Sequence, residues 1–302
     1  MAATISEKPS RAMSNRDGSL RDEDGYHTDL KITNPDYDLP KVPLKQVVVM
    51  ASSQRSGSSM LSAQLASTSC VGVPREYLNP LALANTSIGW GLPRQSFRGH
   101  LGQIRRRIRG NDDWRNPVRF TNHSVGEYLR LLADRRTTAN GVFSMKAHWN
   151  HWEKGFLNTG QQLDLWNAPI SWVRLTRTDL IAQAISLSRA RQSGQWSSHM
   201  AATKSASYDE ARIVRCIEVI EYQTASWDRY FQSLGVEPYV VHYESLVEST
   251  TATVSGLLGW LGFPDARPAP PSTRRQSGTE SAEWHARFLK NHPEYAHRTG
   301  QQ

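Results

Sequence analysis

Long apolar runs and closely spaced cysteines are both missing from this 302-residue sequence. A membrane-spanning helix needs roughly 20 consecutive apolar residues, and no stretch approaches that length. The N-terminal residues also lack the apolar centre of a secretory signal. The two cysteines, Cys70 and Cys216, are too few for a disulfide framework, and neither has a second cysteine or histidine at metal-ligand spacing. We therefore expect a cytoplasmic protein without a transmembrane segment or a metal site.

The charge of the chain is strongly positive. Its formal net charge is +8 at pH 7 and its pI is about 9.6, which favours anionic partners such as nucleotides, sulfated donors and nucleic acids. Hydrophobic residues (38%) and charged residues (21%) are present in ordinary globular proportions. A chain of this length can bury a sizeable core, so we expect one large folded domain with appendages.

Composition divides the chain into three kinds of segment. Residues 1–40 mix charged residues with Ser, Asn, Asp and Gly, show almost no apolar periodicity and predict a flexible N-terminal tail. Residues 41–302 form the predicted folded domain. Within it, residues 85–122 carry eight arginines from Arg94 to Arg119, with aromatic residues among them, and predict a variable, arginine-rich insertion.

Strands and helices alternate along the folded domain. Apolar runs at 47–51, from Gly141, from Ala168 and at 239–243 predict strands. Amphipathic stretches predict helices directly after the first strand and at 179–191, 208–234 and 244–260, and Gly235 can cap the helix at 208–234. This order predicts an α/β, three-layer fold in which a central parallel sheet is flanked by helices.

The segment "VVVMASSQRSGSSMLSAQLAST", residues 47–68, contains the strongest functional signal. A buried strand leads through a loop of small residues to the start of a helix, where unpaired backbone N–H groups and the helix dipole attract anions. Gly57 permits a close backbone approach, Arg55 supplies a cation, and the serines add hydroxyl donors. The loop is P-loop-like but lacks the lysine of the nucleoside triphosphatase motif, and a purely structural turn stays open as an alternative.

The same segment, extended to "SCVGVPREYL", resembles the first strand, phosphosulfate loop and helix of sulfotransferases similar to bacterial trehalose 2-sulfotransferase, which use 3'-phosphoadenosine-5'-phosphosulfate (PAPS). The resemblance continues in "NGVFSMKAHWN", "RTDLIAQAISLSRARQSGQW" and "RRQSGTESAEW", in the order of the family. It implies sulfuryl transfer from PAPS, without a metal, to a hydroxyl of a small-molecule acceptor such as a sugar or glycolipid. Members of the family can form homodimers.

The resemblance also implies the residues that hold the donor. The 5'-phosphosulfate would contact Arg55, Ser56, Gly57, Ser58 and Ser59; Ser59 stands where the family usually has Thr, which keeps the hydroxyl. The 3'-phosphate would contact Arg177 and Ser186, because a guanidinium can grip a phosphate through two bonds and a hydroxyl can donate a third. Arg274, Arg275 and Gln276 would lie in a loop that closes over the nucleotide.

Two further residues are candidates for the chemistry. An attacking alcohol needs a general base, and the resemblance gives that role to Glu76 in "GVPREYLNP". Lys146, near the carboxyl end of a predicted strand, could stabilise charge on the transferred group. A surface ion pair for Glu76 and a salt bridge for Lys146 remain alternatives, and His148 and His151 are either other candidate bases or packing residues.

Two other classes of protein fit parts of the pattern. A P-loop kinase or nucleoside triphosphatase would need an acidic Mg²⁺ ligand at the end of a strand, and Glu244 is the candidate. A nucleic-acid-binding protein could use Arg94–Arg119, but Asp112 and Asp113 interrupt the basic residues and no binding motif is present, so we expect no nucleic-acid partner. Four tryptophans could stack on a sugar or build the core: Trp149, Trp152, Trp166 and Trp196.

Overall fold

The computed structural model describes residues 38–79, 82–83, 90, 122–196, 202–270 and 278–300, with the backbone alone for 122–124. Several sequence predictions fall on other residues. Most of the predicted tail (1–40), nearly all of the predicted insertion (85–122) and the predicted closing loop with Arg274, Arg275 and Gln276 lie outside the described residues, and these stay predictions.

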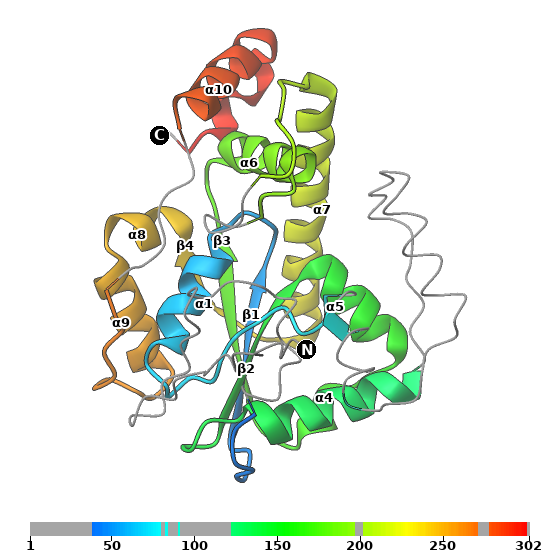
Figure 1. Ribbon diagram of the computed structural model, residues 1–302, viewed down its shortest axis with the longest axis vertical. Helices are drawn as coiled ribbons and strands as arrows, with labels where there is room; N and C mark the ends of the chain where they lie inside the picture. The colour runs from blue at the N-terminus through cyan, green and yellow to red at the C-terminus, as the bar shows by residue number, and fades with distance from the viewer. Residues whose placement is uncertain are drawn as a thin grey trace, which may run out of the picture.

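A parallel sheet of four strands forms the centre of the described structure, in the order β2-β1-β3-β4 (Figure 1). The strands are β1 (Gln46–Ser52), β2 (Val142–His148), β3 (Ile170–Thr176) and β4 (Tyr239–His242). In the register of the sheet, Val47 pairs with Phe143 on one side and with Ile170 on the other. All four strands therefore end at the same edge, and the predicted α/β fold is confirmed.

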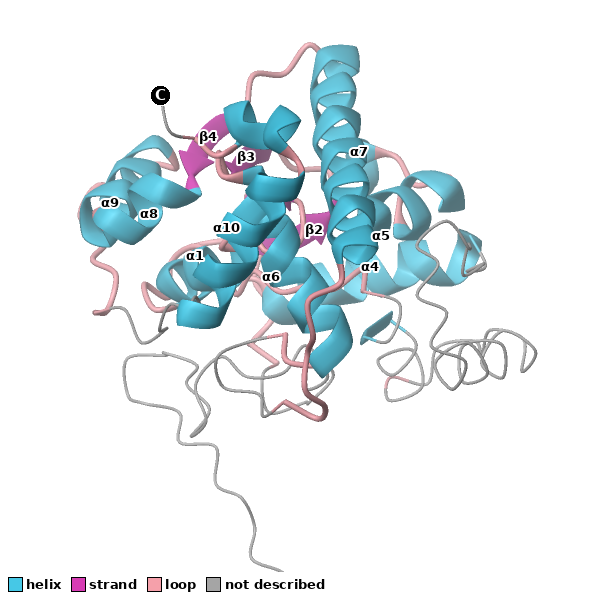
Figure 2. Cartoon of the chain, turned by 90° about the horizontal axis from the view of Figure 1, so that it is seen from above, coloured by secondary structure: helices cyan, strands magenta, loops and turns pink. Residues whose placement is uncertain are grey.

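Helices cover both faces of the sheet, and the views in Figures 1 and 2 agree on their arrangement. One face carries α1 (Ser58–Ala66), α8 (Tyr243–Glu248) and α9 (Thr250–Trp260). The other carries α4 (Asn122–Arg136), α5 (Trp149–Gly155) and α7 (Glu210–Leu234). Beyond the carboxyl ends of the strands lie α6 (Leu180–Ser193) and α10 (Thr279–Asn291). Short 3₁₀ helices are η3 (Leu157–Thr159), η4 (Leu163–Trp166) and η5 (Pro293–Arg298).

Alternate residues of β1 supply two separate cores. Val47 and Val49 pack with β2 and the α4, α5 and α7 layer, whereas Val48 and Met50 pack with α1 and α9. This is the period-2 alternation of a strand that is buried on both faces. The apolar run that predicted the first strand therefore reflects burial on both faces of the sheet.

Three of the four singled-out tryptophans belong to the core. The rings of Trp149, Trp152 and Trp166 are buried in the α4, α5 and α7 layer, and Trp152 stacks on Phe156 with ring centroids 4.1 Å apart. Among these four, only Trp196 lies at the surface, where the residue is 42% exposed. The alternative that these tryptophans build the core is thus correct for three of them.

The predicted helix at 244–260 is wrong in one respect, because the structure divides it into α8 and α9 at Ser249. Ser249 has φ −137° and ψ 59°, outside the helical region. The Thr250 hydroxyl donates to the Leu246 carbonyl at 2.7 Å, and the Thr253 hydroxyl donates to the Ser245 carbonyl at 3.0 Å. Hydroxyl groups that compete for backbone partners in this way weaken a continuous helix.

Within the described ranges, no helix combines the length and apolar character that crossing a membrane requires.

Candidate active site

The loop between β1 and α1 has the backbone shape that its sequence predicted. Arg55 and Gly57 both adopt positive φ angles, 63° and 89°. A Cβ atom on Gly57 would lie 2.5 Å from Cδ2 of Tyr243, so only glycine fits here. Gly57 is also the N-cap of α1 and has no side chain to cap it, which leaves the first N–H groups of the helix to bind an anion.

Polar contacts from α6 and within the loop itself hold this loop in place. Gln183 donates from Nε2 to the Ser53 hydroxyl at 2.9 Å and to the Gln54 carbonyl at 2.7 Å. The fully buried Ser56 hydroxyl donates to the Ser53 carbonyl at 2.8 Å. The Ser56 hydroxyl, one of the predicted donor contacts, therefore acts inside the loop. Ser58 is buried as well, and Ser59 is exposed.

The structure brings the two predicted phosphate sites together. Arg55 donates from Nε to the Ser186 hydroxyl at 2.9 Å, and Arg177 donates from Nη1 to the Arg55 carbonyl at 3.3 Å. Burial, and then the neighbouring Arg177, lower the pKa of the Arg55 guanidinium to about 10. Two neighbouring guanidinium groups in a half-buried place favour the binding of an anion between or beside them.

Tyr243 completes the basic corner that Arg55 and Arg177 form, and the sequence analysis did not single it out. It is the first residue of α8, directly after β4, and its ring lies under Arg177 with the guanidinium carbon 4.4 Å from the ring centroid. A cation over an aromatic face is attracted by the ring. The available signal was its position at the carboxyl end of a predicted strand, where ligands bind in α/β sheets.

Glu76 reaches the carboxyl edge of the sheet because its own segment adds to β2. Arg75 forms an isolated parallel bridge to Met145, and the Lys146 backbone N–H donates to the Arg75 carbonyl at 2.9 Å. The Glu76 carboxylate then meets the Lys146 ammonium, with Oε1 and Nζ 2.9 Å apart and side chains only 12% and 3% exposed. The surface ion pair considered for Glu76 is therefore wrong, because this pair is buried.

Two histidines and an amide surround the same carboxylate. His148 Nε2 lies 3.0 Å from Oε1, His151 Nδ1 lies 3.9 Å from Oε2, and Asn79 donates to Oε2 at 3.3 Å. Burial alone would raise the pKa of Glu76, but Lys146 and His148 outweigh it and hold the pKa well below its ordinary value. Burial lowers the pKa of His151 to about 3 despite the opposing charge of Glu76, so His151 is neutral near pH 7.

Lys146 connects the carboxylate to the anion-binding loop. Its ammonium donates to the Ser59 hydroxyl at 3.3 Å while it contacts Glu76. Ser59 lies in the first turn of α1, where the helix N-terminus is most positive. A buried carboxylate, a cation and a helix N-terminus thus lie within one connected set of contacts.

A hydrogen-bonded Ser52–His148–Glu76 series resembles the order of a serine-hydrolase triad, but its geometry does not fit that role. The Ser52 hydroxyl lies 3.0 Å from His148 Nδ1. Ser52 is fully buried in the last position of β1, and its carbonyl accepts from the Trp227 indole. A nucleophile must reach its substrate, so this serine acts within the protein.

Glu244, the candidate Mg²⁺ ligand of a kinase, has a structural partner. Its Oε1 accepts from the backbone N–H of Thr178 at 3.1 Å and of Asp179 at 3.5 Å, directly before α6. The part of the chain that the structure describes contains no group of three or more Asp, Glu, His or Cys residues arranged to hold a metal ion.

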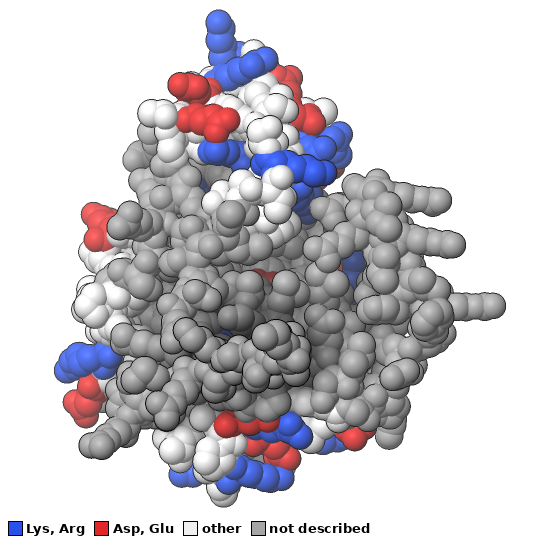
Figure 3. Space-filling view, viewed as in Figure 1, with Lys and Arg blue, Asp and Glu red and all other residues white. Residues whose placement is uncertain are grey.

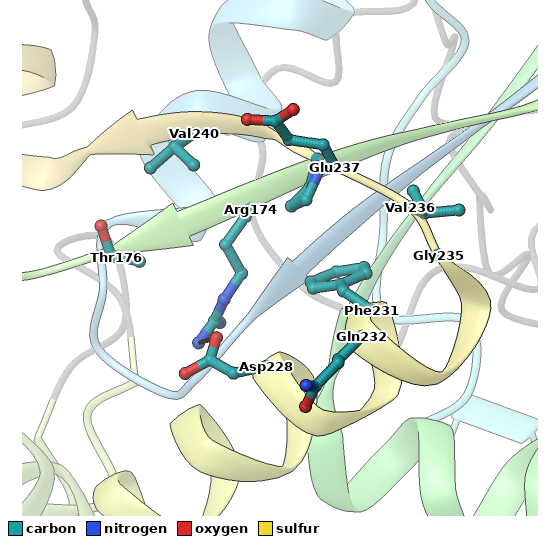
Figure 4. Close-up of a pocket in the computed structure, with 10 residues that line it drawn as sticks. Arg174, Thr176, Asp228, Phe231, Gln232, Gly235, Val236, Glu237 and Val240 are labelled. Carbon is teal, nitrogen blue, oxygen red and sulfur yellow. Dashed lines mark hydrogen bonds and ion pairs between the residues drawn. The ribbon is translucent and has the colours of Figure 1, made fainter.

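A surface hollow between α7 and β4 lies apart from these residues. Figure 4 shows Arg174 pointing toward Asp228, with which it pairs at 3.3 Å, while Phe231 and Val236 supply apolar wall. None of its lining residues belongs to the predicted donor or catalytic set.

Charged contacts fasten α10 beside the basic corner. Arg189 of α6 pairs with Glu280, and His285 lies 3.4 Å from the Asp179 carboxylate. Figure 3 shows acidic and basic side chains mixed over this end of the molecule. The helix that follows the predicted closing loop is therefore held against α6, from its N-cap Asp179 to Arg189.

These features are typical of a class, the α/β group-transfer enzymes with an anion-binding loop at the carboxyl edge of a parallel sheet. Comparison with known proteins gives the particular family. The Stf0 sulphotransferase family model matches residues 47–291, and the chain belongs to this family of sulfotransferases. The family assignment confirms the resemblance seen in the sequence and argues against the kinase alternative.

Two relatives are trehalose 2-sulfotransferases. The protein from Mycobacterium tuberculosis (strain ATCC 35801 / TMC 107 / Erdman) is 27% identical over 261 residues, covering 81% of this chain and 95% of the relative. The protein from Mycolicibacterium smegmatis (strain ATCC 700084 / mc(2)155) is 28% identical over 271 residues, covering 80% and 94%.

Proposed function

We propose that this sulfotransferase moves a sulfuryl group from PAPS to a hydroxyl of a carbohydrate or other small acceptor, with Glu76 as the general base. The observation that carries the proposal is the continuous contact from Glu76 through Lys146 to Ser59 at the start of α1. It joins a buried carboxylate to an anion-binding loop. The names of the two relatives support a sugar as the acceptor.

The residues present fit a donor with two anionic ends. The N-terminus of α1, Arg55 and Ser59 would hold the 5'-phosphosulfate through backbone N–H groups, a guanidinium and a hydroxyl. Arg177 and Ser186 would hold the 3'-phosphate, a group that ATP lacks. The lowered pKa of Arg55 supports this fit. A bound anion would offset both the desolvation of its charge and the repulsion from Arg177.

The chemistry then needs position and charge more than covalent help. The acceptor oxygen forms a bond to sulfur as the bond from sulfur to the 5'-phosphate oxygen breaks, giving a sulfate ester and adenosine 3',5'-bisphosphate. Glu76 takes the hydroxyl proton, and Lys146 balances the charge that grows on the leaving oxygen. Lys146 is suited to this because it already contacts Ser59 beside the loop.

Calorimetric titration with adenosine 3',5'-bisphosphate, and separately with ATP and Mg²⁺, tests the donor. We expect micromolar affinity for the bisphosphate and little response to ATP. A preference for ATP and Mg²⁺ would overturn the proposed donor. Radiolabelled PAPS offered with trehalose and with a panel of other sugars then identifies the acceptor, and transfer to none of them would refute the carbohydrate class.

Two substitutions assign the roles. Arg177→Ala should weaken the bisphosphate far more than 5'-AMP, because only the former carries a 3'-phosphate, whereas Arg229→Ala on the exposed side of α7 should weaken neither. Equal weakening of both ligands by Arg177→Ala would contradict the second phosphate site.

Glu76→Gln should keep donor affinity and slow turnover by roughly 10² to 10⁴, the usual worth of a general base. Full activity would remove Glu76 from that role.

A further inference from the structure

His148 lies between a buried hydroxyl and the carboxylate proposed as the base. Its Nδ1 is 3.0 Å from the Ser52 hydroxyl, and its Nε2 is 3.0 Å from Glu76 Oε1. The imidazole is only 6% exposed. Both ring nitrogens therefore meet protein partners rather than water.

The partners fix which nitrogen carries the proton. An ionised Glu76 can only accept hydrogen bonds, so the facing Nε2 must donate. In a neutral imidazole Nδ1 is then the acceptor, and the Ser52 hydroxyl is the donor that fits it. The hydrogen bonds run in one direction, from Ser52 through His148 to Glu76.

We propose that His148, oriented by Ser52, is a positioning residue that directs the catalytic carboxylate of Glu76 toward the acceptor. Nε2 of His148 and Nζ of Lys146 both hold Oε1, at 3.0 Å and 2.9 Å. Among the described residues, the contacts of Oε2 are longer, to Asn79 at 3.3 Å and to His151 at 3.9 Å. Oε2 is therefore the oxygen that takes the proton from the acceptor hydroxyl. This inference rests on the proposed role of Glu76.

Among the side chains that the structure describes, the charged and titratable groups around this pair come from β2 and α5, and Lys154 of α5 also acts on His151. From β2, Lys146 and His148 face Glu76, and from α5, His151 faces both, with its ring centroid 5.4 Å from that of His148. His151 stays neutral above its pKa of about 3. A rise of the Glu76 pKa from its depressed value can thus be traced to a lost contact with Lys146 or His148.

Two amide substitutions separate the two ring nitrogens. His148→Gln can place an N–H near the position of Nε2 and keep the bond to Glu76, whereas His148→Asn can reach only toward Ser52. We expect His148→Asn to lower kcat about tenfold or more with little change in bisphosphate affinity, because a hydrogen bond to a charged carboxylate is lost. His148→Gln should stay within about threefold of the unmodified enzyme. His292→Asn is the matched control, because His292, at the C-terminal end of α10, also contacts carboxylates, those of Glu210 and Glu294.

The pH profile distinguishes positioning from a general loss of structure. Loss of a donor to Oε1 weakens the stabilisation of the ionised carboxylate and raises the pKa of Glu76. The acid limb of kcat/KM should therefore move to higher pH in His148→Asn and return toward its original place in His148→Gln. Equal kcat values for the Asn variant and the unmodified enzyme, or a fall in kcat without movement of the acid limb, would overturn the proposal.

Nuclear magnetic resonance of ¹⁵N-histidine in the full unmodified chain tests the hydrogen-bond direction without any turnover. We expect the His148 ring to carry its proton on Nε2, which faces Glu76, and Ser52→Ala to allow the other tautomer. A proton on Nδ1 alone in the unmodified protein would refute the proposal even if the Asn variant fails to fold. If the unmodified protein transfers no sulfuryl group and binds no bisphosphate, the proposed function fails separately from the tautomer.

Discussion

Replacement of Lys146 by Met tests the buried pair on which the site is built. The side chains of Lys146 and Glu76 are 3% and 12% exposed and their charged atoms lie 2.9 Å apart. Methionine keeps most of the lysine stem but removes the ammonium, so Glu76 retains a buried charge with fewer donors. Breaking a buried pair from one side costs about 3–5 kcal/mol, and the remaining contacts of His148 and Asn79 place our expectation near the lower end.

Urea denaturation at pH 7.5 measures this loss, and an exposed pair supplies the control. Lys41 and Asp134 approach even more closely, at 2.7 Å, but their side chains are 72% and 43% exposed. Lys41→Met should therefore lower the free energy of unfolding by less than about 1 kcal/mol. Similar losses in the two variants would refute the reasoning that burial, and not distance, sets the strength of the Lys146 contact.

A double-mutant cycle isolates the pair itself. Adding Glu76→Gln to Lys146→Met removes the buried charge that Lys146→Met leaves behind, so the double variant should be more stable than the sum of the single losses by about 1–3 kcal/mol.

The contribution of Glu76 to the free energy of unfolding should depend on pH with a defined sign. The pKa of Glu76 is depressed, so its contribution to stability is present above about 4.5 and is lost as pH falls through the lower folded value. The advantage of the unmodified protein over Lys146→Met should shrink over that acid range, and a constant difference would contradict the pairing.

Three further changes have defined outcomes. Gly57→Ala should weaken bisphosphate binding in calorimetry and lower stability by about 1–3 kcal/mol, because φ is 89° and the new Cβ would meet Tyr243. Gly259→Ala, in the exposed part of α9 with open space around it, should instead raise stability by about 0.4–1 kcal/mol in urea denaturation. Asp179→Ala removes the N-cap of α6, whose side chain accepts from the Ala182 N–H, and should lower the thermal midpoint through a loss of about 1 kcal/mol.

The sequence predicted the sheet well because β1, β2 and the centre of β3 are buried on both faces, whereas the predicted burial of the fourth strand is wrong: β4 lies at the sheet edge and Val240 is 46% exposed. The run from Val47 to Ala51 and the loop through Gly57 each carry strong local signals, apolar continuity in one case and backbone freedom in the other. The caps of α6 and α7 were also visible, because Asp179 and Gly235 are residue types that favour helix ends. The break at Ser249 was missed because serine and threonine weaken a helix only where their hydroxyls find carbonyl partners.

The partners of Glu76 were harder to predict, since they depend on register. The bridge from Arg75 to Met145 fixes which residues of β2 lie beside the carboxylate, and no local pattern reveals a single bridge. One part of the arrangement was readable. Lys146 and His148 are two residues apart on a strand, so they must face the same side of the sheet. That spacing could have linked His148 to the site once Lys146 was placed there.

His148 and Lys146 both contact Glu76 Oε1, but they differ in their other partners. His148 contacts Ser52 and Glu76, so its effect is confined to the base. Lys146 contacts Glu76 and also Ser59 at the start of α1, so it bears on both the base and the anion-binding loop. Replacement of Lys146 should therefore change donor affinity together with turnover, whereas replacement of His148 should change turnover alone.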